Sequence, residues 1–305
     1  MISRYNYRDF TWIDIESPTQ EELLHIAEEW AIPPHISEEL ANHTIRPKVE
    51  NTKDLLYLVL HFPSTTTTNT KHKAYELDFI IGKNFLITVH YEPIDALYVF
   101  SKTFEVSSIL DRDNRASTPG FVFSALIRAL YKNCLEELDA ITHTLNALER
   151  EIFSSKEDLT IKRISSISKK ILDFRQATRS HADILKSFES TSVAIFGQEY
   201  KQTADILISE YNKVHNAVEQ NRDTLMELKD THAALVSSRS QDIMKTFTVM
   251  TVIMLPMSLL VGIFTIRLPE GVYLAKTIRD FYFILGAMTL TALVMVLFFK
   301  IKKWI

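Results

Sequence analysis

The chain has 305 residues, a net charge of -4 and a single cysteine, Cys134. One cysteine excludes an intrachain disulfide, and an acidic balance without a basic stripe argues against nucleic-acid binding. With only six glycines, the chain has little material for phosphate-binding loops. No dinucleotide fingerprint, nucleophile elbow or HExxH motif occurs. We therefore expect a protein that is not an enzyme and carries no resident cofactor.

The N-terminal part, residues 1–118, alternates short strand-like runs with short helical ones. A first helix is expected after Ser17, which offers a cap residue followed by a proline at the first helical position. A second short helix is expected from Pro33. β-Branched and aromatic residues predict strands over 10–15, 55–62, 75–81 and 85–90. This part is predicted to be a mixed α/β domain.

Residues 119–245 are predicted to form a long helical stalk. Glycine and proline are absent from 121–196 and from 198–255, so little would interrupt a helix there. Apolar residues recur at steps of mostly three, four or seven, which is typical of coiled-coil seams: Cys134, Leu138, Ile141, Leu145, Leu148 and Ile152, then Ile164, Ile167, Ile171 and Phe174, then Leu207, Tyr211, Val214, Val218, Leu225, Leu228 and Leu235.

Two polar residues, Asn221 and His232, interrupt the last of these seams. Polar residues at seam positions can determine the helix register or the oligomeric state. The alternative is partial exposure where the seam frays, and the pattern alone does not separate the two interpretations.

The last part, residues 246–305, contains two uncharged apolar stretches, 246–266 and 281–299, joined by the loop 267–280. At about 1.5 Å of rise per residue, each stretch spans roughly 30 Å, which is the thickness of the hydrocarbon core of a bilayer. The sequence thus predicts an α+β membrane protein: a cytoplasmic α/β domain, stalk helices and two C-terminal transmembrane helices.

Basic residues are distributed unequally around the two spans, and this predicts the orientation. Six flank the outer ends of the hairpin and three lie in or next to its loop: Lys229, Arg239, Lys245, Lys300, Lys302 and Lys303 against Arg267, Lys276 and Arg279. The excess of basic residues at the outer ends predicts that both termini lie in the cytoplasm. The protein is then expected to be a multi-pass protein of the inner (plasma) membrane. Because a two-span chain cannot enclose a pore alone, we expect a homo-oligomer in the lipid bilayer.

Several segments, in their order along the chain from residue 10 to residue 305, resemble the CorA family of magnesium transporters. They are Trp12-Ile-Asp-Ile, Pro18-Thr-Gln-Glu-Glu-Leu, Arg46-Pro-Lys-Val-Glu, Gly82-Lys-Asn-Phe-Leu-Ile-Thr-Val-His, Met244-Lys-Thr-Phe-Thr, Pro256-Met-Ser-Leu-Leu-Val-Gly-Ile-Phe and Lys302-Lys-Trp-Ile. The resemblance implies a homopentameric funnel that transports divalent cations, magnesium or cobalt, through a pore lined by the first span.

Carried over residue by residue, the pore-lining positions of the family are Gln241, Met244, Phe247, Thr251, Leu255 and Ser258. Steps of three and four residues keep these positions on one helical face. The three apolar residues would form rings that gate by dewetting, and the three polar ones would offer oxygens to a hydrated ion. The alternative is that Met244 and Phe247 pack against helices at the membrane interface.

The pore mouth departs from the family. The signature Tyr-Gly-Met-Asn is replaced by Phe264, Thr265, Ile266 and Arg267. Arginine offers only donors and a positive charge. Five arginines about 8 Å from a divalent ion in water would oppose it by roughly 5 kcal/mol before screening. Arg267 therefore faces the pore as a barrier, or it pairs with Glu270 or reaches outward to lipid phosphates.

The altered mouth leaves the transported ion open. Branches of the family that move zinc alter the same signature, so a zinc-transporting relative is one alternative, and a non-conducting membrane-anchored scaffold is another. The family also binds regulatory magnesium between cytoplasmic domains. The resemblance places such a metal site near Asp205, but the expected aspartate position is Ile206 in this chain.

Overall fold

The computed structural model describes residues 1–44, 46–52, 55–64, 74–109, 118–153, 157–265, 278–302 and 304. The chain divides into two compact units, Met1–Leu228 and Lys229–Ile305. The long helix α7 (Glu199–Thr265) contributes residues to both units. The three-part division at residues 118 and 245 stays a prediction.

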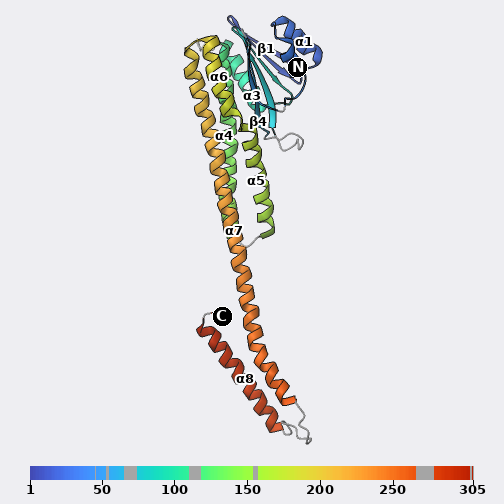
Figure 1. The fold of residues 1–305 in the computed structure, drawn as a ribbon, viewed down its shortest axis with the longest axis vertical. Helices are drawn as coiled ribbons and strands as arrows, with labels where there is room; N and C mark the ends of the chain where they lie inside the picture. The colour runs from blue at the N-terminus through green and yellow to red at the C-terminus, as the bar shows by residue number, and fades with distance from the viewer. Residues whose placement is uncertain are drawn as a thin grey trace. The chain divides into compact units, whose positions relative to one another are not determined.

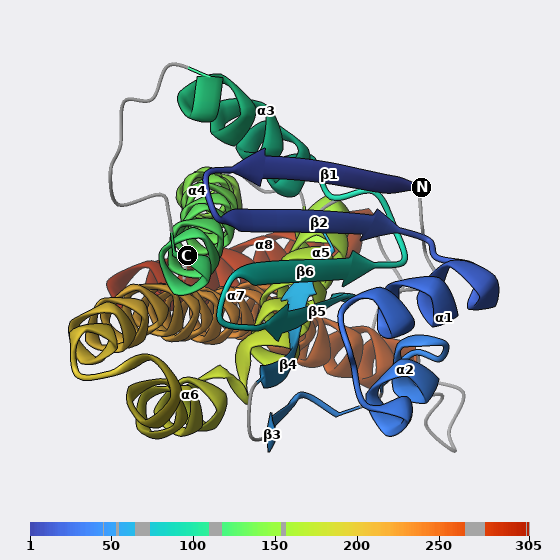
Figure 2. The same cartoon turned by 90° about the horizontal axis from the view of Figure 1, so that it is seen from above.

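One mixed sheet forms the centre of the first unit (Figure 2). Its order is β1-β2-β6-β5-β4-β3, with β2 and β6 parallel and all other neighbours antiparallel. The strands are β1 (Ile2–Tyr7), β2 (Phe10–Glu16), β3 (Lys48–Thr52), β4 (Leu55–Pro63), β5 (Ala74–Ile81) and β6 (Phe85–His90). The four predicted strands are confirmed, whereas the two edge strands β1 and β3 were not predicted.

Two short helices, α1 (Gln20–Glu29) and α2 (Pro34–Leu40), cover one face of the sheet. The predicted cap at Ser17 is wrong by two residues, because Ser17 takes a left-handed φ of 47°. Thr19 caps α1 instead: its hydroxyl accepts from the Glu22 amide, and the Glu22 carboxylate accepts from the Thr19 amide. This reciprocal capping satisfies two amide groups at the helix start.

The other face of the sheet packs against α4 (Pro119–Ile152), α5 (Glu157–Thr178) and α6 (His181–Phe196). Phe79 of β5 meets Phe123 of α4 edge to face, and Phe123 in turn contacts Phe188 of α6. Figure 2 shows these helices on the side of the sheet away from α1 and α2, with α3 (Asp95–Ile109) beside β1. The first unit is thus a three-layer arrangement of helix, sheet and helix.

The predicted seams are confirmed within the first unit. Seam residues of α4, α5 and the first part of α7 are all buried, among them Leu138, Ile167 and Val214. Asn221 is also buried, at 3% exposure, so the interpretation of a frayed seam is wrong at this position. His232 is half-buried.

The second unit contains the C-terminal part of α7 and the helix α8 (Ile278–Ile301). Both helices are long and apolar enough to cross a membrane, by length and composition. The prediction of two C-terminal apolar helices is therefore confirmed (Figure 1). α7 runs without interruption through Pro256 to Thr265.

Candidate functional site

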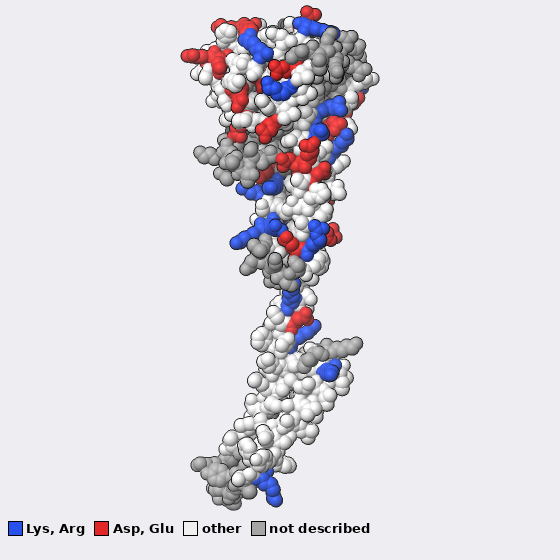
Figure 3. Space-filling view, turned by 180° about the vertical axis from the view of Figure 1, so that it is seen from behind, with Lys and Arg blue, Asp and Glu red and all other residues white. Residues whose placement is uncertain are grey.

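The described surface of the second unit carries few charges. From residue 246 to residue 265, α7 has none, and Figure 3 shows an uncharged surface on this part of the unit. Immediately before this stretch of α7, Lys245 pairs with Asp242 at 3.2 Å. Because an uncharged helix surface of this length is stable in hydrocarbon, the unit has the properties of a membrane anchor or a membrane pore.

One face of α7 is used for packing within the second unit. Val249 is buried at 6% exposure, and Ile253, Pro256, Met257 and Leu260 are half-buried at steps of one, three or four residues. α8 shows a matching stripe, made up of Ile284, Met288, Thr291, Met295 and Phe299. Figure 1 shows α8 beside this part of α7, which indicates that the two stripes face each other.

The six predicted pore positions lie on the opposite face. All are exposed in the single chain, with Met244 at 65%, Phe247 at 61% and Leu255 at 64%. At about 100° per residue, the centre of this face lies roughly 170° from the centre of the packing face. Exposure in a single chain is compatible with a pore face and with packing against helices of another copy, so both interpretations of Met244 and Phe247 stay predictions.

The hydroxyl groups on the exposed face have their hydrogens engaged. Thr251 donates to the carbonyl of Phe247 at 2.9 Å, and Ser258 donates to the carbonyl of Met254 at 3.0 Å. Each hydroxyl oxygen retains lone pairs that point away from its donated hydrogen. These oxygens can accept hydrogen bonds from the water shell of a cation, and they carry no charge that would trap it.

The predicted pore mouth is described only at its first residues. Thr265 is the last residue of α7, and its hydroxyl donates back to the carbonyls of Val261 and Gly262 at 3.1 and 2.8 Å. Phe264 belongs to the same helix. Ile266, Arg267 and Glu270 lie outside the described residues, so the alternatives for Arg267 remain as the sequence left them.

The predicted regulatory metal position, Asp205, lies on an exposed face of α7 in the first unit. Its neighbour Ile206 is 46% exposed. Within the described part of the chain, no group of three histidine, cysteine or acidic side chains is arranged to hold a metal ion. A role for Asp205 in metal binding stays a prediction.

Comparison with known proteins gives matches along nearly the whole chain. A relative from Thermotoga maritima, called cobalt/magnesium transport protein CorA, is 23% identical over 97% of this chain and 83% of its own length. The complete structure of the CorA magnesium transporter from Methanocaldococcus jannaschii matches with a TM-score of 0.85 and 20% identity, covering 100% of this chain and 94% of that one.

A more distant fold match is the cytoplasmic domain of ZntB from Vibrio parahaemolyticus. It has a TM-score of 0.63 and 12% identity, over 75% of this chain and 88% of that one. The model of the family described as CorA-like Mg2+ transporter protein matches residues 7–303. Since this match covers both units, the chain belongs to the CorA-like Mg2+ transporter family.

Proposed function

We propose that this chain transports a divalent metal cation across a membrane, magnesium with cobalt as a second substrate, through a homo-oligomeric pore lined by α7. The observation that carries the proposal is the family match over residues 7–303, which includes both units. The names of relatives such as the Thermotoga maritima protein support magnesium and cobalt as substrates. Because this family is described as transporters, we also propose that the chain is not an enzyme.

The chemistry of the exposed α7 face favours passage of a hydrated ion. Between Gln241 and Ser258 the six proposed pore positions carry no charged side chain and offer only amide and hydroxyl oxygens. Magnesium loses its water shell reluctantly, so uncharged acceptors for those waters suit it better than direct ligands. Met244, Phe247 and Leu255 would form apolar constrictions whose dewetting closes the path.

Assembly follows from the same face. An α7 surface with large apolar side chains more than 60% exposed in one chain needs either lipid or neighbouring copies around it. Polar oxygens at Gln241, Thr251 and Ser258 interrupt this surface, and lipid cannot hydrogen-bond to them. A ring of α7 helices around a wet path places both kinds of side chain favourably. The family resemblance implies five copies.

The proposed placement in the membrane uses the charges next to the spans. Lys229, Arg239, Lys245, Lys300 and Lys302 would lie on the cytoplasmic side of an inner (plasma) membrane, with both termini there. The short connection between α7 and α8 would then face outward and carry Arg267 and Glu270 at the mouth.

The altered mouth favours one alternative substrate, zinc, and one alternative role, a non-conducting scaffold. The fold match to the ZntB cytoplasmic domain shows shared architecture and does not identify an ion. In a scaffold the two helices would serve only as an anchor. A measurement of ion flux distinguishes magnesium or cobalt transport, zinc transport and a non-conducting scaffold.

The test is ion flux into proteoliposomes that contain the purified full-length chain. Uptake of magnesium, cobalt, zinc and chloride is measured separately with ion-specific dyes, against protein-free vesicles. We expect magnesium or cobalt uptake that saturates and is absent for chloride. Uptake of zinc alone would show that zinc, and not magnesium or cobalt, is the substrate. If a protein with an intact oligomer takes up none of these ions, the transport proposal is overturned.

A further inference from the structure

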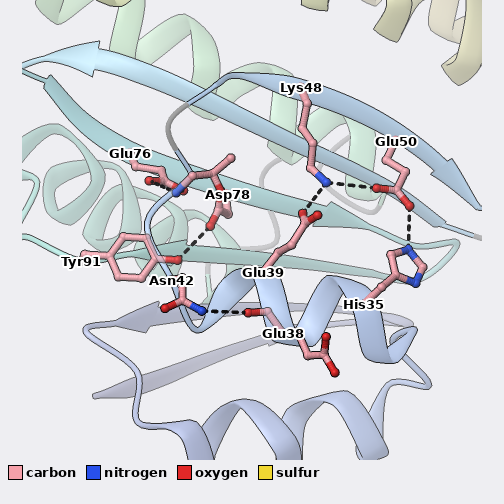
Figure 4. A network of polar contacts seen from close by, with 10 residues as sticks. His35, Glu38, Glu39, Asn42, Lys48, Glu50, Glu76, Asp78 and Tyr91 are labelled. Carbon is pink, nitrogen blue, oxygen red and sulfur yellow. Dashed lines mark hydrogen bonds and ion pairs between the residues drawn. The ribbon is translucent and has the colours of Figure 1, made fainter.

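Two carboxylates with opposite environments lie side by side on the sheet face that α2 covers (Figure 4). Glu76 and Asp78 are alternate residues of β5, so both side chains project from the same face. Alternating acids in a strand normally indicate a solvent-facing side. Here Glu76 is 5% exposed and Asp78 is fully buried.

Glu76 has the partners of an ionised carboxylate. The amide of Thr44 donates to both of its oxygens at 2.9 Å, and the His43 and His61 rings approach Oε2 at 3.3 and 3.8 Å. Burial raises the pKa of Glu76, but the hydrogen bonds from His61 and Thr44 outweigh burial, so the pKa lies below its usual range. Glu76 is therefore a buried negative charge.

Asp78 has no such support. Its Oδ2 lies 3.2 Å from the Tyr91 hydroxyl oxygen, and its Oδ1 is buried without a hydrogen-bond partner among the described residues. Burial, followed by the negative charge of Glu76, raises the pKa of Asp78 well above its usual range. The surroundings thus favour the neutral acid.

The geometry at Tyr91 gives an independent argument for the same proton. The Tyr91 hydroxyl oxygen lies 2.9 Å from the carbonyl oxygen of Leu40, the last residue of α2, as well as 3.2 Å from Asp78. A hydroxyl has one hydrogen, and a carbonyl only accepts. When Tyr91 donates to Leu40, the second contact is a full hydrogen bond only if Asp78 donates to Tyr91, which requires a proton on Oδ2.

We propose that Asp78, Tyr91 and Leu40 form a proton-dependent latch for the C-terminal end of α2. With Asp78 protonated, hydrogen bonds run from Asp78 to Tyr91 and from Tyr91 to the Leu40 carbonyl. When Asp78 loses its proton, the Tyr91 hydrogen turns to the new carboxylate, and the Leu40 carbonyl loses its donor. The end of α2 and the segment that follows it are then released from the sheet.

The charges around Asp78 set the direction of this response. Glu76 from β5 and Glu39 from α2 oppose ionisation of Asp78, whereas the Tyr91 hydrogen bond and Lys48 from β3 favour it, and burial outweighs both. Lys48 is already paired with Glu39 and, at 3.1 Å, with Glu50. Among the described residues, other titratable groups near this sheet face include Tyr57 and His61 of β4, His35 of α2, His43, Tyr91 and Glu92.

The latch also has a route to solvent. Tyr91 lines a cavity of about 200 Å³ together with His43, His61 and Glu76. Because the Tyr91 hydroxyl contacts Asp78, this cavity is the route that we propose for proton exchange between Asp78 and solvent. The latch therefore responds to the pH around the first unit, with release of the α2 end towards alkaline pH.

The first test is infrared spectroscopy of the full-length protein in detergent over a range of pH. A protonated buried carboxyl gives its own carbonyl stretching band, which we expect at neutral pH and which should disappear at alkaline pH. Asp78→Asn should remove the band. Glu76→Gln removes the neighbouring charge and should shift loss of the band to lower pH. A band that persists in Asp78→Asn would overturn the proposal.

The second test is amide hydrogen exchange of residues 38–44 at each pH, with every variant compared with wild type at that pH. Asp78→Asn can still donate to Tyr91, so these amides should stay protected at alkaline pH, where wild type becomes about tenfold less protected. Tyr91→Phe should be unprotected at every pH. Tyr98→Phe, at an exposed position of α3, serves as the control. Identical pH profiles for wild type and Asp78→Asn would overturn the latch.

Discussion

Asn221 of α7 and Thr142 of α4 are joined by a hydrogen bond of 2.8 Å between the threonine hydroxyl and the asparagine Oδ1. The Asn221 amide group also donates to the carbonyl of Leu138 at 3.1 Å. Asn221 is buried within an apolar seam, so only one relative position of α4 and α7 satisfies it. This pair sets the register of the two helices within the first unit.

Asn221→Ala should lower the stability of the first unit by about 2–3 kcal/mol, because it removes buried hydrogen bonds and leaves a cavity. In thermal unfolding followed by circular dichroism, we expect a midpoint lowered by several degrees. Asn212→Ala, on an exposed position of the same helix, is the matched control and should change the midpoint little. Equal effects of both substitutions would contradict a register role for Asn221.

Leu255→Ser should raise cation flux in proteoliposomes by roughly tenfold, since a polar ring keeps an apolar constriction wet and about 1.4 kcal/mol corresponds to a factor of ten. Met250→Ser is the control. Met250 is similarly exposed, at 55% against 64%, but lies about 140° away from Leu255 around the helix. If Met250→Ser raises the flux as much as Leu255→Ser does, the pore face is assigned wrongly.

Arg267→Asn should raise divalent cation flux by tenfold or more if the arginine faces the pore, because the opposing charge of each subunit is removed. Arg267→Lys keeps the charge and should behave like wild type. The increase should be smaller at high salt, which screens charges across the mouth. Unchanged flux in Arg267→Asn, in a protein that conducts, would support pairing with Glu270 or an outward position.

His181 should make the first unit sensitive to acid. It is fully buried, its Nε2–H donates to the carbonyl of His61 at 2.8 Å, and its Nδ1 accepts from Tyr131 at 2.8 Å. Burial lowers the pKa of His181 to about 4. The unfolded chain binds a proton below about pH 6.5, so stability should fall as pH drops from there to about 4, by on the order of 3 kcal/mol.

The measurement is the unfolding midpoint as a function of pH for wild type, His181→Gln and His25→Gln. Glutamine at position 181 can keep one donor and one acceptor but does not titrate, so the acid slope should flatten. His25 is exposed, and its substitution should leave the slope unchanged. An acid slope that is the same in wild type and His181→Gln would show that other groups cause it.

Features that depend on neighbours in sequence were predictable. The apolar repeat in α4, α5 and α7 predicted buried seams, because helical geometry places residues three and four apart on one side. Two long uncharged stretches predicted membrane-spanning helices, because charge is expensive in hydrocarbon. The steps between Gln241 and Ser258 likewise define one face of α7 by their spacing alone.

Features that depend on distant segments were not predictable. The edge strand β3 contains Lys48, Glu50, Asn51 and Thr52, a polar run with little strand character, and it exists because β4 pairs with it. The prediction that Ser17 caps α1 was wrong because Ser17 takes a left-handed backbone conformation before the helix begins. Which side of α7 packs and which stays exposed depends on α8, which the sequence of α7 does not contain.

The sequence by itself determined that this protein has an α/β part, long paired helices and a two-span C-terminus, because periodicity and span length are local properties. Only the tertiary structure decided that Asn221 bonds to Thr142, that the candidate pore face lies opposite the packing face, and that Asp78 is buried. Asp78 is the sharpest case. Its place in an alternating strand predicts exposure, and only the packing of α2 over that face turns it into a buried acid.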